Sequence, residues 1–380
     1  MRAVVTHQSE LEVSEVPTPV PGAGQVLVRT LRTGICGSDL HARAHADVLA
    51  DVAAGLGYAT VMRPEHRVVM GHEILGEVVS YGPGTRRRWK RGTRVVAMPI
   101  LRTGGAARLV GFDEAAPGGY AEHVLVQEAL AFPVPDGVPD DAAVFTEPLA
   151  VALHAVRRAG VGRRPAVVVG CGPIGLAVIA MLKASGVRRV IASDLSPARR
   201  ELARQCGADV VVDPRETDLW AELAVPGPLR SLPGYLDLAV EATGLLRKVP
   251  LLPWQRLMRA ANVLGAGPAG PVVFECVGVP GILDEVIAGV PLQSRIVVVG
   301  VCMEPDTFRP AVAIHKEIDL RFVFGYDPAE FAAALDLISD GKVDPAPLHT
   351  GTVGLDGVAG AFADLADPER HAKILVDPSR

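Results

Sequence analysis

The pattern of apolar and polar positions divides this chain into two unlike parts. Up to residue 154, short apolar segments such as residues 25–31, 75–81 and 94–98 are separated by proline and glycine. This pattern predicts an irregular, β-rich domain. From Pro165 on, apolar strand segments alternate with segments of helical period. That alternation predicts an α/β unit built on a doubly wound parallel sheet.

The alternating part begins with five elements in sequence. The predicted strands are residues 166–169, 189–193 and 209–212, and the predicted helices are residues 174–185 and 197–206. Ser196 and Pro197 supply a cap and a first-turn proline, which define where the second helix begins.

Two later segments both have the pattern of the next buried strand, each with a carboxylate and a terminal glycine. They are residues 238–244 and residues 272–278. We favour the second as the sheet strand, because a helix and the strand at 295–299 then follow at ordinary spacing. Residues from about 220 to 270 are then an insertion. The C-terminal part is predicted to hold a helix at 329–340 and a last strand at 372–376.

Size and composition favour a soluble enzyme with a small-molecule substrate. A chain of 380 residues exceeds what one core usually fills, so we expect two domains. The net charge of −5 gives no general attraction to nucleic acid or to a membrane, and the basic run at 86–91 is interpreted as a solvated loop.

The N-terminus lacks the apolar core of a secretion signal, which favours the cytoplasm. No apolar stretch is long enough to span a membrane. The five cysteines are scattered, and neither a disulfide framework nor a zinc ribbon is expected.

A glycine motif follows the first strand of the parallel sheet and opens the next helix. It reads Gly170, Cys171, Gly172, Pro173, Ile174, Gly175. The glycines allow a tight turn and close approach of a pyrophosphate to the helix N-terminus. Asp194 ends the next strand, where a carboxylate binds the adenosine ribose and repels a 2′-phosphate. The sequence therefore predicts NAD rather than NADP, although Arg199 and Arg200 could weaken that preference. The alternative is a glycine-rich turn that binds no ligand.

Zinc ligands of mixed type gather in the β-rich part. The candidates are Cys36, His72, Glu73 and Glu147. Taken singly, each such residue is more often structural than a ligand, but a thiolate, an imidazole and carboxylates together suit one zinc ion. The set lacks the paired cysteine spacing of a structural site, which favours a catalytic metal with an open position.

Five motifs give the chain a resemblance to a known family. They are residues 34–41, 71–73, 118–122 and 147–150 and the glycine motif at 170–175. With them the chain resembles the zinc-dependent medium-chain dehydrogenase/reductase family, of alcohol dehydrogenase type, in its sorbitol, threonine and butanediol dehydrogenase branch. The resemblance implies a GroES-like catalytic domain at 1–154, an NAD-binding Rossmann domain at 155–309, and a C-terminal segment, 310–380, that completes the catalytic domain. A homodimer or homotetramer is expected.

Carried over by position, the resemblance assigns roles to the site residues. Cys36 and His72 would bind zinc, and Glu147 stands where relatives have a cysteine or a glutamate. Glu73 would be an inner-sphere or exchanging ligand, and which carboxylate binds at rest is left open. Asp39 would orient His72, with a turn or capping carboxylate as the alternative.

The resemblance also implies a proton relay through Ser38 and His41. The two residues are three apart and would share one face of a helical turn. The alternative for His41 is a solvent-exposed helix residue.

The chain departs from its relatives in two places. Residues 97–120 contain no cysteine, so we predict one zinc ion and no structural zinc site. Residues 42–67 are longer than usual between the ligands and are expected to reshape the substrate cleft.

Together these features predict reversible oxidation of a secondary alcohol or polyol, with hydride transfer to NAD and zinc as the Lewis acid. The alternatives are a zinc-independent NAD(P)H reductase and a non-enzymatic dinucleotide-binding protein. The sequence does not identify the alcohol.

Overall fold

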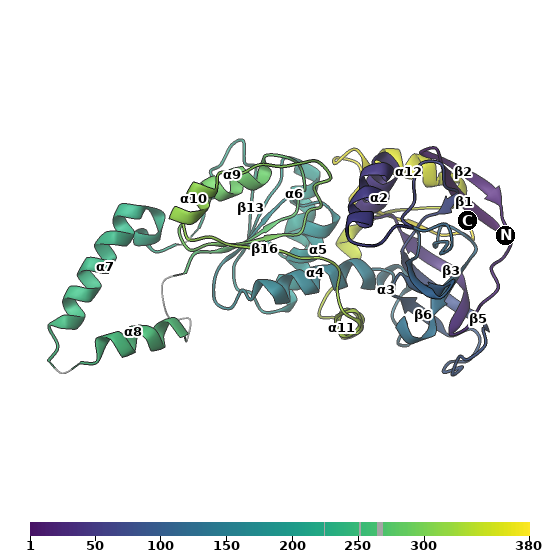
Figure 1. Ribbon diagram of the computed structural model, residues 1–380, viewed down its shortest axis with the longest axis horizontal. Helices are drawn as coiled ribbons and strands as arrows, with labels where there is room; N and C mark the ends of the chain where they lie inside the picture. The colour runs from purple at the N-terminus through teal and green to yellow at the C-terminus, as the bar shows by residue number, and fades with distance from the viewer. Residues whose placement is uncertain (224, 251, 264–268) are drawn as a thin grey trace.

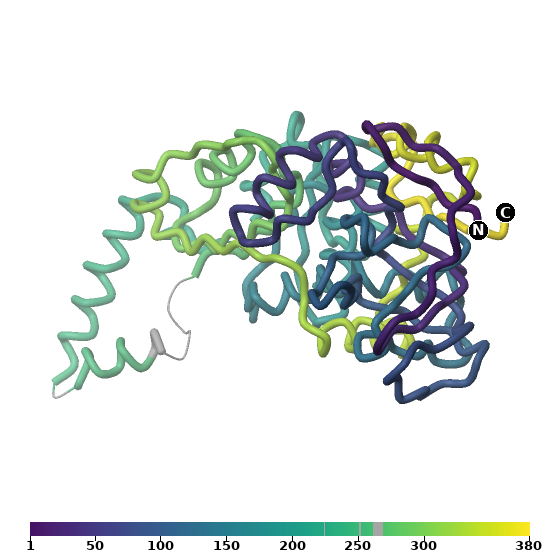
Figure 2. Tube along the Cα trace, turned by 45° about the vertical axis from the view of Figure 1, so that its right-hand side comes forward, coloured from purple at the N-terminus to yellow at the C-terminus, as the bar shows by residue number. Residues whose placement is uncertain are grey.

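The computed structural model describes residues 1–223, 225–250, 252–263 and 269–380. It has a β-rich lobe that contains both termini and an α/β lobe beside it (Figure 1). Figure 2 shows the first and last segments of the chain side by side in the β-rich lobe. A pair of helices, α7 (Leu232–Arg247) and α8 (Trp254–Val263), projects from the far end of the α/β lobe in both views.

The β-rich lobe is built on a seven-stranded sheet with the order β10-β6-β5-β3-β18-β17, in which β9 also pairs with β3. Its strands are β3 (Gln25–Gly34), β5 (Glu73–Tyr81), β6 (Arg94–Ala97), β9 (His123–Gln127), β10 (Ala131–Pro133), β17 (His349–Val353) and β18 (Lys373–Val376). A smaller sheet contains β1 (Arg2–His7), β2 (Glu10–Glu15) and β4 (Val68–Val69), and β7 (Ile100–Thr103) forms a hairpin with β8 (Ala106–Leu109). These strands confirm the β-rich first part that the sequence predicts.

The end of the chain is part of this first sheet. Strand β18 pairs antiparallel with β3, with Leu375 opposite Gly34 and Val376 opposite Thr33. Residues of β18 are therefore held next to the segment that leads from β3 to Cys36.

The α/β lobe contains a six-stranded parallel sheet with the order β13-β12-β11-β14-β15-β16. Its strands are β11 (Ala166–Val169), β12 (Val190–Ser193), β13 (Val210–Val212), β14 (Val272–Glu275), β15 (Arg295–Val298) and β16 (Asp319–Phe322). The sheet confirms the predicted doubly wound fold, because its strand order reverses at β11. Strand β16 lies beyond residue 309, where we predicted the Rossmann domain to end, so its sheet continues into the segment assigned to the catalytic domain.

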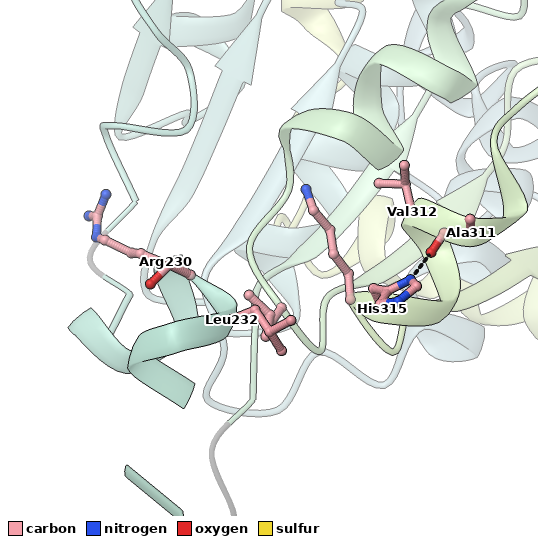
Figure 3. A pocket seen from close by; sticks show the side chains of 8 residues that line it. Arg230, Leu232, Ala311, Val312 and His315 are labelled. Carbon is pink, nitrogen blue, oxygen red and sulfur yellow. Dashed lines mark hydrogen bonds between the residues drawn. The ribbon is translucent and has the colours of Figure 1, made fainter. Parts of the chain in front are cut away.

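The structure also decides between the two candidate strands. Residues 272–275 form β14 between β11 and β15, as the spacing predicts, whereas residues 238–244 lie within helix α7. The inserted segment thus leaves the sheet and returns to it. A cavity of about 370 Å³ lies where α7 begins, lined by Arg230, Leu232, Ala311, Val312 and His315 among others (Figure 3). It contains none of the predicted site residues.

The remaining helices pack around the two lobes. They are α1 (Gly37–Ala44), α2 (Ala46–Gly55), α3 (Asp140–Ala143), α4 (Thr146–Ala159), α5 (Pro173–Ala184), α6 (Pro197–Gln205), α9 (Ile282–Gly289), α10 (Pro310–His315), α11 (Pro328–Ser339) and α12 (Val358–Leu365). The largest apolar cluster joins α4 and α5 to the parallel sheet and to α11. Within the described ranges, no helix combines the length and apolar character needed to cross a bilayer.

Candidate metal and cofactor sites

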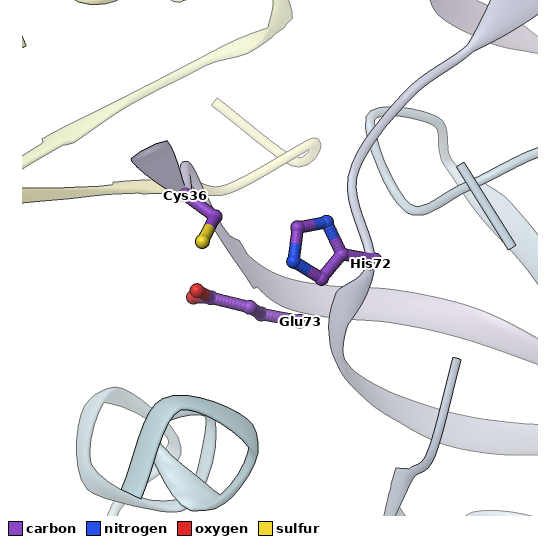
Figure 4. A group of neighbouring side chains, drawn as sticks. All are labelled: Cys36, His72 and Glu73. Atoms are coloured by element: carbon purple, nitrogen blue, oxygen red, sulfur yellow. The ribbon is translucent and has the colours of Figure 1, made fainter. Parts of the chain in front are cut away.

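Three of the four predicted metal ligands lie together. The ligand atoms of Cys36, His72 and Glu73 all lie within 4.8 Å of one another. Figure 4 shows the thiol, the imidazole and the carboxylate directed toward a common space. The sheet explains the arrangement, because Gly34 pairs with Glu73 across β3 and β5 and Cys36 follows as the N-cap of α1. Two segments distant in sequence are thus brought to one point by strand pairing.

The Glu73 carboxylate fits a metal ligand. The Glu73 side chain is fully buried, yet its Oε2 has no hydrogen-bond partner in the structure. A Cβ atom at Gly34 would lie 1.7 Å from this oxygen, so glycine is needed for the carboxylate to fit. A buried acceptor is normally satisfied. An ion held by Cys36, His72 and the Glu73 carboxylate would satisfy it, and this mixed sulfur, nitrogen and oxygen set suits zinc.

Asp39 makes the contact with His72 that the sequence predicts. Its Oδ1 lies 3.0 Å from His72 Nδ1, and its Oδ2 accepts hydrogen bonds from the Tyr120 hydroxyl at 2.6 Å and the Cys36 amide at 2.9 Å. Burial raises the pKa of Asp39, but the attraction of His72 and these hydrogen bonds together outweigh burial. The pKa of Asp39 therefore lies below its ordinary value. The carboxylate holds Nδ1 of the ring and leaves Nε2 available as a ligand.

Glu147, the fourth predicted ligand, lies outside the group of three. It is buried near the start of α4, and its Oε1 accepts a hydrogen bond of 2.8 Å from the Tyr326 hydroxyl. Burial raises the pKa of the Glu147 carboxyl to about 7; His72 opposes this rise and Glu73 adds to it. The site therefore has two carboxylates with different partners. Sequence reasoning missed Tyr326, which comes from the loop before α11.

The raised pKa of Glu147 predicts how the zinc-free protein responds to pH. The native state keeps a proton on Glu147 between the ordinary value of 4.5 and about 7, whereas the unfolded state loses it. Stability must then fall as pH rises through this window, by about 3 kcal/mol. Urea unfolding in the presence of a chelator at pH 5 and pH 7.5 measures the effect. In Glu147→Gln the slope should be shallower, because the group that keeps the extra proton in the native state is absent. Equal slopes in the two proteins would contradict the prediction.

The two predicted relay residues lie on α1. Ser38 Oγ is 3.4 Å from His72 Nε2, so the hydroxyl reaches the metal site. His41 is half-buried, and its ring lies 6.4 Å from that of His45 between centroids. Burial, followed by the proximity of His45, lowers the pKa of His41. A neutral imidazole at pH 7 is able to accept a proton.

Residues 97–120, which contain no cysteine, are linked to the long segment at 42–67 by the carboxylate of Asp113. Asp113 accepts hydrogen bonds from the Thr60 hydroxyl at 2.5 Å, the Tyr58 hydroxyl at 3.3 Å and Arg108 at 3.0 Å. The neighbouring Phe112 ring lies 4.9 Å from that of His72 between centroids. Asp113 therefore ties the long segment at 42–67 to a residue that packs on a candidate ligand.

The glycine motif has the tight turn that a dinucleotide requires. Gly170 has a φ of +90°, and a Cβ there would lie 2.7 Å from Val277. A Cβ on Gly175 would lie 1.9 Å from the Gly170 carbonyl oxygen. Gly172 is the N-cap of α5 and Pro173 its first residue, followed by Ile174. The helix N-terminus thus ends at a backbone surface without side chains, which a pyrophosphate needs.

Asp194 lies beside this turn. Its Oδ2 accepts a hydrogen bond of 2.7 Å from the Cys171 amide, and its Oδ1 accepts one of 2.8 Å from Ser196. Arg200 binds Asp213 and backbone carbonyls, whereas Arg199 Nη1 lies 4.0 Å from the position of a Cβ on Gly172. Of the two arginines, Arg199 is the one near the glycine turn.

Lys373 is a site residue that sequence reasoning missed. Its side chain is 1% exposed, and its Nζ forms an ion pair with Glu73 Oε1. Burial lowers the pKa of Lys373, but Glu73 and Cys36 outweigh this effect and raise it. The one signal in the sequence is a lysine at the start of an apolar strand, which is more often a surface residue.

The chain is similar in sequence and fold to known dehydrogenases. Residues 22–136 match the alcohol dehydrogenase GroES-like domain, and residues 173–247 match the zinc-binding dehydrogenase family. The chain is 31% identical to (R,R)-butanediol dehydrogenase of Bacillus subtilis, with 100% of both chains covered. It is 27% identical to sorbitol dehydrogenase of Gallus gallus, with 95% of this chain and 92% of that protein covered. The crystal structure of 2R,3R-butanediol dehydrogenase from Bacillus subtilis superposes with a TM-score of 0.73 and 29% identity over 99% of both chains.

Proposed function

The chain belongs to the zinc-dependent medium-chain dehydrogenase/reductase family, and from that premise we propose that it oxidises a secondary alcohol or polyol to a ketone with NAD. The observation that supports this most is the cluster of Cys36, His72 and Glu73, in which one oxygen of the buried carboxylate has no hydrogen-bond partner. The same chain has a glycine turn at 170–175 of the kind that binds a dinucleotide, with Asp194 hydrogen-bonded to it. A metal site and a hydride acceptor together define this class of reaction.

The chain's own residues divide the work of the reaction. Zinc, when bound, acts as a Lewis acid that lowers the pKa of the substrate hydroxyl. Asp39 holds His72 in the orientation of a ligand, and Ser38 lies where its hydroxyl can take up the substrate proton as it gives up its own proton. His41 accepts the released proton and passes it toward solvent. The hydride leaves the substrate carbon for C4 of the nicotinamide, and the carbon becomes a carbonyl.

The test is NADH formation with a panel of vicinal diols, sugar alcohols and hydroxy acids, together with zinc analysis of the purified protein. We expect oxidation of at least one diol or sugar alcohol and one zinc ion per chain. Activity on quinones or activated alkenes without zinc would replace this proposal by a zinc-independent reductase. NAD binding with no turnover of any compound would favour a dinucleotide-binding protein. Two tightly held zinc ions per chain would contradict the single site.

A preference for NAD follows from Asp194. Its carboxylate beside the glycine turn would bind the ribose hydroxyls and repel a 2′-phosphate. Asp194→Ala should reduce the ratio of kcat/KM for NAD over NADP by about 10- to 100-fold, since one repulsive and one attractive contact are lost together. Arg204→Ala serves as the control, because it removes a positive charge from helix α6, where Arg204 pairs with the exposed Glu201, and should leave the ratio unchanged. A wild-type enzyme with a higher kcat/KM for NADP would overturn the preference.

We further infer a homodimer or homotetramer in the cytoplasm. Strand β16 ends the parallel sheet in the described part of the chain, and Phe322 and Phe324 beside it are 67% and 93% exposed. An edge strand with exposed aromatic side chains supports association of two copies. A monomeric mass by sedimentation at micromolar concentration would contradict the assembly, and recovery outside the cytosolic fraction would contradict the location.

A further inference from the structure

Lys373 is an uncommon feature of the metal site, because a buried ammonium repels a metal cation. It is fully buried, it comes from β18, and its one charged contact is Glu73. The ion pair occupies Glu73 Oε1 and leaves Oε2 without a hydrogen-bond partner, while the carboxylate lies within 4.8 Å of the ligand atoms of Cys36 and His72. The space for this pair is provided by Gly34, since a Cβ there would lie 3.2 Å from Lys373 Cε as well as against Oε2.

The charges show what Lys373 contributes. Cys36 as a thiolate, Asp39 and Glu73 supply three negative charges around the metal site, apart from Glu147, whose pKa is raised to about 7. A zinc ion with two positive charges leaves one of these three uncompensated, and the ammonium of Lys373 completes their balance. Zinc and Lys373 also compete for the same carboxylate, because a stronger bond from Glu73 to one cation weakens its attraction to the other.

We propose that Lys373 is a positioning residue that keeps Glu73 a weak, single-oxygen ligand, so that one coordination position at the metal stays free for substrate. This inference rests on the proposed function, since it assumes zinc in the site. A role in folding alone predicts the opposite effect on the metal, because a damaged site binds zinc less tightly.

Removing the ammonium should therefore strengthen zinc binding while activity falls. In Lys373→Met the Glu73 carboxylate loses its buried counter-ion, and the metal becomes its one available partner. Chelator competition should show zinc held about 10- to 100-fold more tightly than in the wild type. In the cobalt-substituted protein, the visible ligand-field bands should lose intensity as both oxygens of Glu73 bind, because higher coordination weakens them. Turnover should fall, since less positive charge and less space remain for the substrate oxygen.

Four further variants make the result specific. Lys373→Gln tests the charge with a polar side chain, and it replaces the Met variant if that protein does not fold. Lys373→Arg keeps the charge and should retain the wild-type cobalt spectrum. Glu73→Gln combined with Lys373→Met should abolish the gain in zinc affinity. The carboxylate that loses its ion pair with Lys373, and so binds the metal more strongly, is absent in this double variant. Lys316→Met removes a lysine that binds three carbonyls of the other lobe and should leave zinc affinity unchanged.

The outcomes separate this inference from the function on which it rests. Tighter zinc binding in Lys373→Met, with altered cobalt bands, supports the role of Lys373. Unchanged or weaker zinc binding in a folded Lys373→Met or Lys373→Gln protein overturns it, while the wild type still binds zinc and oxidises alcohols. A wild type that binds no zinc overturns both the inference and the proposed function.

Discussion

Cys36→Ala is expected to abolish alcohol oxidation and zinc binding while leaving NAD affinity close to that of the wild type. The thiolate is the ligand with the strongest preference for zinc in the group of three, and its loss leaves an imidazole and a carboxylate that is also held by Lys373. A Lewis acid contributes several kcal/mol to this kind of reaction, so kcat should fall by about a thousandfold or more. Zinc analysis, kcat and NAD titration by fluorescence measure the three effects.

The control for this experiment is another cysteine of similar size. Cys302 lies in the α/β lobe, where its thiol contacts the Glu304 carbonyl and no candidate ligand. Cys302→Ala should keep the full zinc content. Retention of zinc and of more than a tenth of the activity in Cys36→Ala would remove Cys36 from the site.

The second large effect is expected at the relay. Ser38→Ala removes the hydroxyl next to His72 Nε2 and should lower kcat by about 100- to 1,000-fold, because the group that takes up the substrate proton first is lost. His41→Gln should slow oxidation by about tenfold, and most strongly below neutral pH, where bases in the buffer are scarce. Added small amine bases should restore part of the rate in His41→Gln. The measurement is the pH dependence of kcat with and without added base.

His45 provides the matched control for His41. It lies one helical turn further on, and its ring lies beside that of His41. His45→Gln should keep the wild-type pH profile of kcat, except that the pKa of His41 rises slightly. The rise is expected because the proximity of His45 lowers that pKa in the wild type. A His41→Gln enzyme with an unchanged pH profile would show that the proton leaves Ser38 through water instead.

The parallel sheet could be predicted because its signals are local. Strands β11 and β12 and the glycine turn are each defined by adjacent residues. Residues 238–244 show the limit of such signals, since a short apolar run fits a strand or a helix equally well. Sheet spacing favoured residues 272–278, and the structure places the other segment in α7. The boundary near residue 309 was wrong for the sheet, because the pattern there does not indicate which sheet β16 joins.

The metal site was predictable as far as its ligands lie in recognisable motifs. Cys36 lies two residues after Gly34, and His72 and Glu73 directly follow Gly71. The contact of Asp39 with His72 follows from its place on α1. Lys373 and Tyr326 could not be found this way. Each reaches its carboxylate only through packing of the C-terminal segment, and neither is part of a motif. These contacts depend on the tertiary structure, and a single sequence gives no pattern from which they could be predicted.

The pairing of β18 with β3 also determines when the enzyme can first work during its synthesis. Glu73 and Lys373 are 300 residues apart, so the ribosome needs about 15 to 60 seconds to supply the ammonium after the carboxylate. During that interval the edge of β3 near Cys36 lacks its final partner strand. The nascent chain can therefore complete the α/β lobe before the metal site exists. Translation of β18 closes the sheet and assembles the site in the same step.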